Sequence, residues 1–306
     1  MSPSPDIIFG KHMNNRKKKM SLFRRLAWPA ISLAAAYIVL SFSLSYAHSS
    51  FRSQTHEEVD IMYSSSGSLG EKRYSSAQLA GLPEPVQRYL RYSIREGQKY
   101  MSYARLKHGG SFRPSPSAGW MAIEAEEYFS IEKPGYVWYA EMKPVDHVWL
   151  AARDRYFEGR GNVQAKLFSG VKVADSKGNE TDQGAMVRFL GEAVWFPTAF
   201  LQPNIRWEEI DNSSARAYFT DRGRTVSAVF RFNESGEITS FSADRFMDRS
   251  LESFEGRCSN YEKIRGLVIP KEVEAVWHLK SGDYSYAKFV VSDIEWDLPS
   301  PYDTLL

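Results

Sequence analysis

Arg188 and Glu192 are the only charged residues between Ala185 and Leu201, and they lie four positions apart. Residues at this spacing are neighbours on a helix, so the two side chains can form an ion pair. The run FLGEAVWFPTAFL that contains Glu192 is too short to span a membrane and too apolar for a solvent-facing surface. The pair has two interpretations: a solvent-facing ion pair, or a polar rim that holds a ligand headgroup at a cavity.

Aromatic side chains near this pair are candidates for the walls of such a cavity. The chain holds 18 Phe, 17 Tyr and 8 Trp, and aromatic side chains are common in ligand pockets and in cores alike. A solid packed core is therefore the alternative. We predict that a cavity is lined by Trp138, Phe189, Trp195, Phe196 and Phe200, with Arg188 and Glu192 as its polar rim.

The remaining chemistry-bearing residues do not form a recognisable site. His56, His108, His147 and His278 lack metal-ligand spacing, and Cys258 is the single cysteine, so we expect no metal and no internal disulfide. The chain contains neither a G-x-S-x-G motif nor a Gly-rich phosphate loop. We therefore expect no catalytic residues and no cofactor.

Two aspartates have arginine neighbours. Asp154 lies in RDRYFEGRG and Asp244 in SADRF. This pattern predicts structural ion pairs at strand edges, because acid–base catalysis would need two carboxylates to meet in a cleft and no spacing here predicts that.

The charge of the chain is unevenly distributed. The formal net charge is +2, from 39 Lys and Arg against 37 Asp and Glu. Residues 1–25 contain seven of these cations and one of the anions, which leaves 32 cations and 36 anions in the rest of the chain. Nucleic-acid binding needs a basic surface, so we expect no nucleic-acid partner.

A hydrophobic segment follows the basic N-terminal residues. Leu26–Ala47 has 22 residues without a formal charge, and a helix of that length, about 33 Å, spans a hydrocarbon core of about 30 Å. RKKK and RR precede it, so residues 1–25 are predicted to be a basic cytoplasmic segment. We predict a single-pass protein of the inner (cytoplasmic) membrane, with the main domain periplasmic or extracellular. Cleavage of a signal peptide after Ala47 is the alternative.

The segment after the hydrophobic stretch is polar, serine-rich and aperiodic. Residues 48–73 include SSFRSQTHEE and YSSSGSLGEKR, which is a composition typical of linkers. We predict a flexible tether over 48–73 and an exported, β-rich domain over 74–306.

The exported domain begins with a short helix and continues with period-two alternation. Val86, Leu90 and Ile94 fall on one helical face after two prolines. Strands follow, with KPG, DSKGN, NESG and KSGD as turns. The predicted strands are Ala104–Phe112, Met121–Ile131, Tyr136–Pro144, His147–Phe157, Asn162–Lys172, Ile205–Ile210, Ala215–Thr220, Thr225–Asn233, Glu237–Asp244, Tyr261–Ile264, Val273–Lys280 and Tyr284–Ile294.

Between the two runs of strands lies an amphipathic helix, predicted from Asp182 to Phe196. Asp182 is a suitable N-cap residue, and Pro197 ends the helix. We expect the helix to cover a cavity on the concave face of a curved sheet as a lid. Its wide apolar face consists of Ala185, Met186, Phe189, Leu190, Ala193 and Val194.

Several segments resemble a family of uncharacterised bacterial exported or membrane-anchored proteins, known as a domain of unknown function. They are GWMAIEAEEYFSIEKPGYVWYAEM, RDRYFEGRG, DQGAMVRFLGEAVWFPTAFL, IRWEEIDNSSARA and GLVIPKEVEAVWHLKSGDYSYAKF. The resemblance covers residues 80 to 296 and carries no catalytic residues. The order of helix, strands, central helix and strands is also similar to the periplasmic lipoprotein-carrier fold of the LolA and LolB type. That resemblance implies a half-open antiparallel barrel closed by helices over an apolar cavity.

Together these observations predict an α+β fold, mainly antiparallel β, with a curved half-barrel sheet, helices on its concave face and an N-terminal transmembrane helix. The favoured function is binding of a lipid, lipoprotein or other hydrophobic ligand in the half-barrel cavity at the cell envelope. One alternative is a non-catalytic envelope structural or interaction module with a protein partner. The other is a hydrolase with dispersed catalytic residues.

Overall fold

The computed structural model describes residues 6–67 and 69–302. These residues form two compact units, of which the first ends at Ser50 and the second begins at Phe51. The predicted basic segment 1–25 and the end of the predicted domain at residue 306 lie partly outside the described residues.

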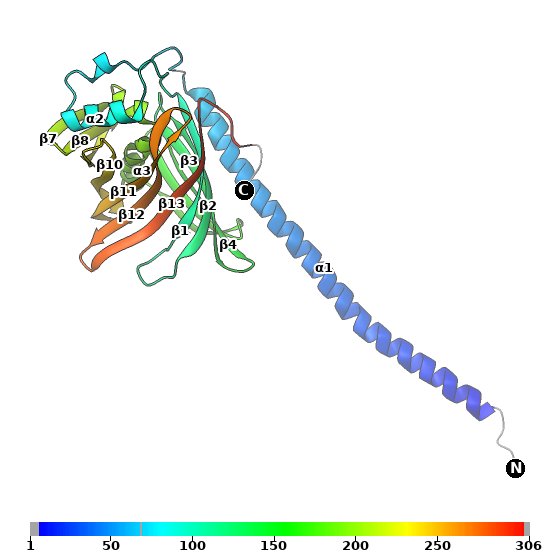
Figure 1. The fold of residues 1–306 in the computed structure, drawn as a ribbon. Coiled ribbons are helices and arrows are strands. Elements are labelled where there is room, and N and C mark those ends of the chain that lie inside the picture. Colours follow the sequence, from blue (N-terminus) through cyan, green and yellow to red (C-terminus); the bar gives the residue numbers. More distant parts are fainter. Residues whose placement is uncertain (1–5, 68, 303–306) are drawn as a thin grey trace. The chain divides into compact units, whose positions relative to one another are not determined.

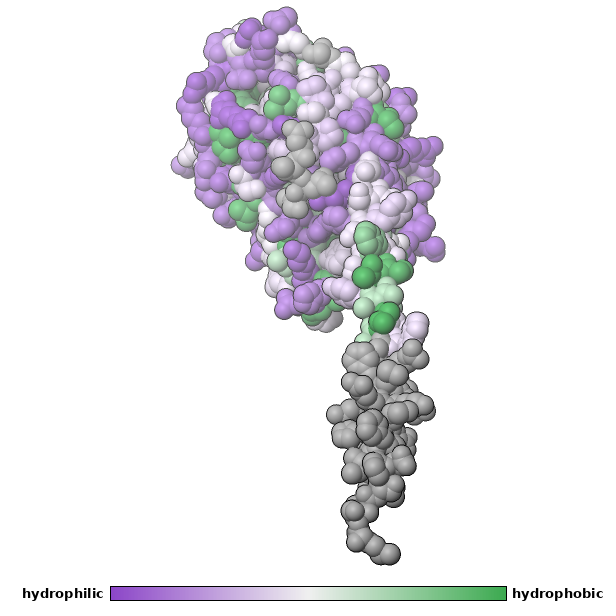
Figure 2. Space-filling view, turned by 90° about the vertical axis from the view of Figure 1, so that its right-hand side faces the viewer, coloured by the Kyte–Doolittle hydropathy of each residue, from purple (hydrophilic) through white to green (hydrophobic). Residues whose placement is uncertain are grey.

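The first unit is part of helix α1 (Asp6–Ser65), which continues into the second unit. From Trp28 onward, α1 is long and apolar enough to cross a membrane. Side chains such as Leu33 and Phe42 are each more than 70% exposed, and Figure 2 shows hydrophobic residues where this part of the helix is visible. A helix that is apolar on all sides suits a bilayer better than water. The structure therefore provides one candidate transmembrane or signal-anchor helix.

The second unit is built on one antiparallel sheet of 13 strands (Figure 1). The strand order is β6-β5-β4-β3-β2-β1-β13-β12-β11-β10-β9-β8-β7, so each half of the chain forms a meander and the last strand pairs with the first. The strands are β1 (Tyr103–Phe112), β2 (Met121–Ser130), β3 (Gly135–Val145), β4 (Val148–Phe157), β5 (Arg160–Leu167), β6 (Val171–Lys177), β7 (Ile205–Asp211), β8 (Ser214–Asp221), β9 (Arg224–Phe232), β10 (Ile238–Met247), β11 (Ser250–Ile264), β12 (Leu267–Leu279) and β13 (Gly282–Trp296).

Helix α3 (Asn179–Glu192) lies on the concave side of this sheet (Figure 1). It contacts β4, β5 and β6 from the first meander and β9 and β10 from the second, so the sheet curves around it. Two short 3₁₀ helices, Ala193–Trp195 and Pro197–Leu201, continue from it and are almost entirely buried. Helix α2 (Glu84–Ser93) contacts β8 and β12, and a 3₁₀ turn (Ser76–Leu79) precedes it. The predicted fold class is confirmed.

Several hairpins turn at the same end of the sheet because neighbouring strands are antiparallel. They are the turns between β1 and β2, β3 and β4, β5 and β6, β10 and β11, and β12 and β13. We call this the hairpin end; it is the lower part of the sheet in Figure 1.

The strand predicted over Asn162–Lys172 is two strands, β5 and β6. Phe168 and Ser169 adopt positive φ angles of 53° and 58° and turn the chain between them. These conformations are uncommon for residues other than glycine, so the sequence pattern carried no turn signal. The predicted turn DSKGN instead forms the end of β6 and the start of α3.

β11 begins at Ser250, whereas the sequence pattern predicts a strand only from Tyr261. The part of β11 that the prediction missed, residues 250–260, alternates weakly because Gly256 occupies an inward position where a large side chain is expected. The ring of Phe241 fills that place: a Cβ on Gly256 would lie 2.2 Å from Phe241 Cζ.

α3 begins at Asn179, earlier than predicted, and Asp182 does not cap it. The buried Asp182 carboxylate accepts a hydrogen bond from the Gly161 backbone at 2.7 Å and pairs with Arg160 and Arg224 at 3.2 and 2.6 Å. It therefore connects β5, α3 and β9 rather than satisfying the helix terminus.

The predicted flexible tether differs from the structure, because α1 extends through Ser65 and its last turns pack on the sheet. Phe51, Val59, Met62 and Tyr63 are buried there. Their spacing of i, i+8, i+11 and i+12 places them on one face of a helix, but the serines and charged residues between them obscure this pattern in the sequence.

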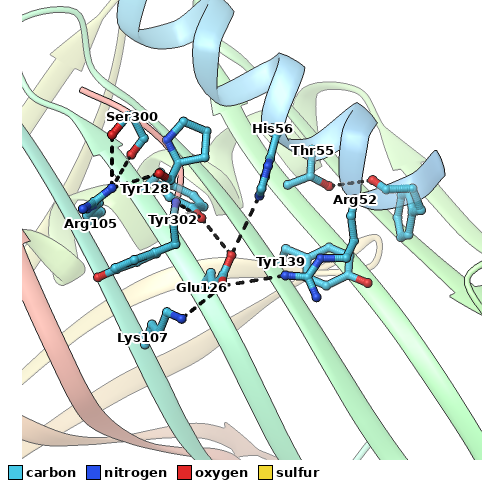
Figure 3. A network of polar contacts seen from close by, with 12 residues as sticks. Arg52, Thr55, His56, Arg105, Lys107, Glu126, Tyr128, Tyr139, Ser300 and Tyr302 are labelled. Atoms are coloured by element: carbon cyan, nitrogen blue, oxygen red, sulfur yellow. Dashed lines mark hydrogen bonds and ion pairs between the residues drawn. The ribbon is translucent and has the colours of Figure 1, made fainter. Parts of the chain in front are cut away.

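A charged network connects this part of α1 to the convex face of β1 and β2 (Figure 3). The Glu126 carboxylate lies 3.7 Å from Arg52, 3.6 Å from Lys107 and 4.0 Å from His56. Tyr128 donates a hydrogen bond to it at 2.8 Å. Burial raises the pKa of Glu126, but the hydrogen bonds and neighbouring cations outweigh burial and bring the pKa below its usual value.

Candidate functional site

A cavity of about 250 Å³ lies between α3 and the concave face of the sheet. It exceeds the roughly 150 Å³ that holds a benzene molecule in a protein core. Partly exposed Phe112, Leu150 and Tyr286 place one side of it near the hairpin end. It is lined by Phe112, Trp138, Met142, Leu150, Ala152, Asp154, Val163, Ala165, Arg188, Glu192, Trp195, Phe241, Arg245, Phe254, Gly256, Val273, Ala275, Tyr286 and Phe289.

Strand alternation brings two carboxylates to the concave side. Successive side chains of a strand point to opposite faces. On β2, Glu127 points to α3 while its neighbour Glu126 points to α1. On β4, Asp154 points to α3 while Arg153 points to α1. Each strand therefore carries charged groups on both faces.

The Arg188 guanidinium of α3 donates hydrogen bonds to three carboxylates. Its Nε donates to Glu192 Oε1 at 2.7 Å, its Nη1 to Asp154 Oδ2 at 2.9 Å, and its Nη2 to Glu127 Oε1 at 2.7 Å. Burial lowers the pKa of Arg188, but the surrounding anions outweigh burial and hold it well above its usual value. Arg188 therefore stays charged and links α3 to β2 and β4.

Two aromatic rings enclose the same guanidinium. The Arg188 Cζ lies 4.9 Å from the ring centroid of Tyr136 and 4.9 Å from that of Trp138. Cation–π contacts of this kind gain strength when the cation is removed from water. The cluster is therefore a fixed, desolvated polar wall of an otherwise apolar cavity.

Glu127 and Glu192 share the excess negative charge of this cluster. Burial raises the pKa of both carboxyl groups, and for Glu127 the neighbouring Glu192 carboxylate raises it further. The Oε2 atom of each is buried without a hydrogen-bond partner among the described residues. A proton on one of the two groups would reduce the excess charge, because two adjacent buried carboxylates do not both ionise readily.

The structure places four of the predicted site residues at the cavity: Trp138, Arg188, Glu192 and Trp195. Arg188 and Glu192 form an ion pair, as their spacing suggests, but both are buried rather than solvent-facing. Trp195 is 1% exposed, and its indole nitrogen donates to the Pro270 carbonyl at 3.1 Å.

The other predicted lining residues, Phe189, Phe196 and Phe200, do not line this cavity. They lie in the packed aromatic core, where the ring centroids of Phe189 and Phe219 are 5.1 Å apart and those of Phe196 and Phe129 are 4.7 Å apart.

The sequence did not identify Glu127 and Arg245 as site residues, and it predicted Asp154 at a strand edge. Asp154 does form an ion pair, but inside the cavity rather than at a strand edge. The available signal was the run EAEEYFS on β2. There Glu127 occupies a position that strand alternation assigns to the inward face, together with Ala125 and Phe129.

His108 lies close to this cluster without joining it. The Trp138 indole donates to His108 Nε2 at 2.8 Å, and His108 Nδ1 lies 3.3 Å from the Gly109 carbonyl. Burial lowers the pKa of His108 to about 3. The imidazole is therefore neutral, with both nitrogens engaged, and is not placed to act as a general base.

The other reactive groups are also buried or dispersed. Burial raises the pKa of the Cys258 thiol to about 12, so the thiol is unreactive. Within residues 28–67 and 69–302, no three His, Cys, Asp or Glu side chains come together in a group that could hold a metal ion.

Comparison with solved structures finds similar chains of low identity. A domain named for outer membrane lipoprotein sorting from Vibrio parahaemolyticus is 9% identical, with 73% of this chain and 94% of that chain covered and a TM-score of 0.38. A LolA superfamily protein from Nitrosomonas europaea is 11% identical (69% and 91% covered, TM-score 0.34). A DUF1329 family protein from Desulfovibrio piger is 10% identical (70% and 91% covered, TM-score 0.37).

The sequence itself identifies the family. No curated protein matches the chain. A family model matches residues 72–289, which include α2, α3, the strands from β1 to β12, the first part of β13 and the residues that line the cavity. The chain therefore belongs to the family of unknown function DUF6544.

Proposed function

We propose that this protein is a membrane-anchored envelope protein that binds the apolar part of a lipid or other hydrophobic ligand in its half-barrel cavity. The observation that supports this most is the cavity of about 250 Å³, whose lining is apolar apart from Asp154, Arg188, Glu192 and Arg245, with one tyrosine. Apolar walls with a few fixed polar groups are typical of small-molecule sites. Each Å² of apolar surface removed from water contributes about 25 cal/mol.

The proposed location is the inner membrane, with the N-terminus in the cytoplasm and residues 51–306 in the periplasm or outside the cell. The apolar helix from Trp28 and the basic residues that precede it in the sequence support this orientation. A binding domain at this place could receive a ligand from the membrane.

A hydrolase is less well supported, although three carboxylates converge on Arg188 and two of them, Asp154 and Glu192, line the cavity. All three are hydrogen-bonded to Arg188, and the nearby His108 is neutral with both nitrogens engaged. No nucleophile paired with a base lines the cavity within the described residues. The arrangement suits binding and orientation of a ligand better than acid–base chemistry.

Native mass spectrometry of the full chain, extracted from a bacterial envelope in detergent, tests the proposal. We expect a co-purifying ligand of defined mass. Ala165→Phe places a ring in the cavity and should remove this ligand, whereas Ala122→Phe adds the same ring at an exposed position on the opposite face of the sheet. A ligand-free wild type that takes up no fatty acid, or a ligand that persists in Ala165→Phe, would contradict the proposal.

A second candidate function, an envelope interaction module, is favoured by the edge strand β6. Within the described part of the chain, β6 pairs with β5 alone, and its residues Val171 and Val173 are 60% and 56% exposed. Exposed edge strands can pair with another chain. In vivo crosslinking from position 173 would capture one specific partner under this candidate function, and a Val173→Pro variant should lose it.

A further inference from the structure

The cavity holds a second arginine that forms no direct ion pair among the described residues, although Asp154 and Glu192 are near enough to attract it. Arg245 on β10 lines the cavity and is half-buried. Its Nε donates to the Gly184 carbonyl at 3.1 Å, and its Nη1 donates to the Tyr286 hydroxyl at 3.3 Å. Within the described part of the chain, no carboxylate forms an ion pair with it, whereas Arg188 has three.

Arg245 and Tyr286 both retain unused hydrogen-bond donors. A guanidinium has five N–H groups, and the described contacts of Arg245 use two of them. The Tyr286 hydroxyl accepts from Arg245 and donates to none of the described residues, so its hydrogen can be donated to a ligand. The Arg245 Cζ lies 4.9 Å from the centroid of the Phe254 ring, a cation–π contact that helps to hold the guanidinium in the cavity.

The position of this pair within the cavity suggests how a ligand would lie. Tyr286 is near the hairpin end of β13, and the apolar side chains Phe112, Met142 and Leu150 line the cavity on β1, β3 and β4. An anionic group beside Arg245 would leave an attached alkyl chain against these apolar walls.

We propose that the cavity takes a single-chain amphiphile with a carboxylate headgroup, which Arg245 and Tyr286 hold by hydrogen bonds. This inference rests on the proposed function, because it names the ligand class of the same cavity. A planar carboxylate matches the fork of a guanidinium. A phosphate carries more negative charge than a carboxylate and would be repelled more strongly by Asp154 and Glu192, which also line the cavity.

The size of the cavity supports one chain rather than two. Its volume of about 250 Å³ is below the roughly 300–1,000 Å³ of sites that enclose a drug-sized ligand. An amine headgroup is disfavoured because the two carboxylates that line the cavity, Asp154 and Glu192, are already bound by Arg188, and because Arg245 would repel it.

The test compares headgroups on one alkyl chain. The full chain in nanodiscs of zwitterionic lipid is exposed at pH 7.5 to matched medium-chain diazirine probes that end in a carboxylate, an alcohol or an amine. Crosslinked peptides are then identified by mass spectrometry. We expect the acid to label the cavity strands at least about tenfold more than the alcohol, because a charge-assisted hydrogen bond strengthens binding by about this factor. Unlabelled decanoate should compete with the acid probe.

Variants assign this selectivity to the named groups. Arg245→Gln should reduce acid labelling to the level of the alcohol, Arg245→Lys should retain part of it, and Tyr286→Phe should weaken it. Arg231→Gln changes an exposed arginine on β9 and should leave it unchanged. Near-UV circular dichroism of each variant verifies that it is folded, and Tyr286→Phe gives an independent test if Arg245→Gln is not.

The outcomes separate this inference from the proposed function. Equal cavity labelling by all three probes, a preference for the amine, or acid selectivity that survives in both Arg245→Gln and Tyr286→Phe overturns the carboxylate assignment and leaves hydrophobic binding standing. Absence of competable labelling in the cavity with every probe overturns both.

Discussion

Replacing Arg188 with methionine tests whether the buried cluster is electrostatically coupled as its geometry suggests. The guanidinium donates hydrogen bonds to Glu127, Asp154 and Glu192 at 2.7 to 2.9 Å. Methionine keeps much of the volume but leaves three buried carboxyl groups without their cation. Removing one partner of a buried ion pair typically costs about 3–5 kcal/mol, and we expect a loss of unfolding free energy in this range at pH 7.5.

The pH dependence of this loss has a definite sign. Burial already raises the pKa of Glu127, Asp154 and Glu192, and Arg188 opposes the rise. Without Arg188 their folded-state pKa values rise further, so the folded variant binds more protons than the wild type. A carboxyl group with a raised folded-state pKa contributes stability that is present below its unfolded pKa, near 4.3 for Glu, and is lost as pH rises through the folded pKa. The deficit of the variant should therefore shrink between pH 7.5 and 5.5, by up to about 1.4 kcal/mol per pH unit for each extra proton.

Urea unfolding of the full chain in a mild detergent, followed by near-UV circular dichroism at both pH values, measures this difference. Arg231→Met, at an exposed position on β9, is the control and should stay within about 0.5 kcal/mol of the wild type. A loss below about 1 kcal/mol, or the same loss at both pH values, would refute the electrostatic account of the cluster.

Further predictions concern packing and the convex-face network. Trp195→Ala should cost about 3–5 kcal/mol, because Trp195 is 1% exposed; a small loss in urea unfolding would instead mark it as a dispensable cavity wall. Gly256→Ala should cost about 1–3 kcal/mol, because its Cβ would lie 2.2 Å from Phe241, whereas Gly119→Ala, with open space around it, should leave the thermal midpoint nearly unchanged. The unfolding free energy of Arg52→Met should stay within about 1.5 kcal/mol of the wild type. Arg52 makes no hydrogen bond to a described residue, and Glu126, 3.7 Å from Arg52, keeps its contact with Lys107 in the variant. A loss like that of Arg188→Met would show that the long contacts of Arg52 contribute to stability.

The fold class was predictable because its signals are local. Period-two alternation and short turns specify antiparallel hairpins, and one amphipathic helix between two meanders must lie on the concave side of their sheet. Phe168 and Ser169 show the limit of such signals, since their positive φ angles depend on the folded surroundings. The packed end of α1 shows another limit, because Phe51 and Val59 are separated by polar residues that pair with the sheet.

The site was less predictable because its members come from distant parts of the chain. Glu192 and Arg188 were identifiable as a pair from their spacing of four. Glu127 on β2 and Asp154 on β4 approach this pair only in the folded sheet, where both strands flank β3. A core aromatic and a cavity aromatic have the same sequence signature, so Phe189 and Trp195 could not be distinguished beforehand.

Net stabilisation is a poor explanation for the Arg188 cluster, because well-packed apolar residues often stabilise a core as much as a buried ion pair does. Its geometry suggests a different role. The contacts of Arg188 to Glu127 and Asp154 hold α3 at one position on β2 and β4, and desolvated charges tolerate little displacement from their partners. An apolar replacement would let α3 settle onto Trp138 and the strands beneath, which would fill the cavity. Arg188→Met therefore separates two kinds of loss: if the cluster maintains the cavity, the variant should lose ligand even at pH 5.5, where much of its folding stability has returned.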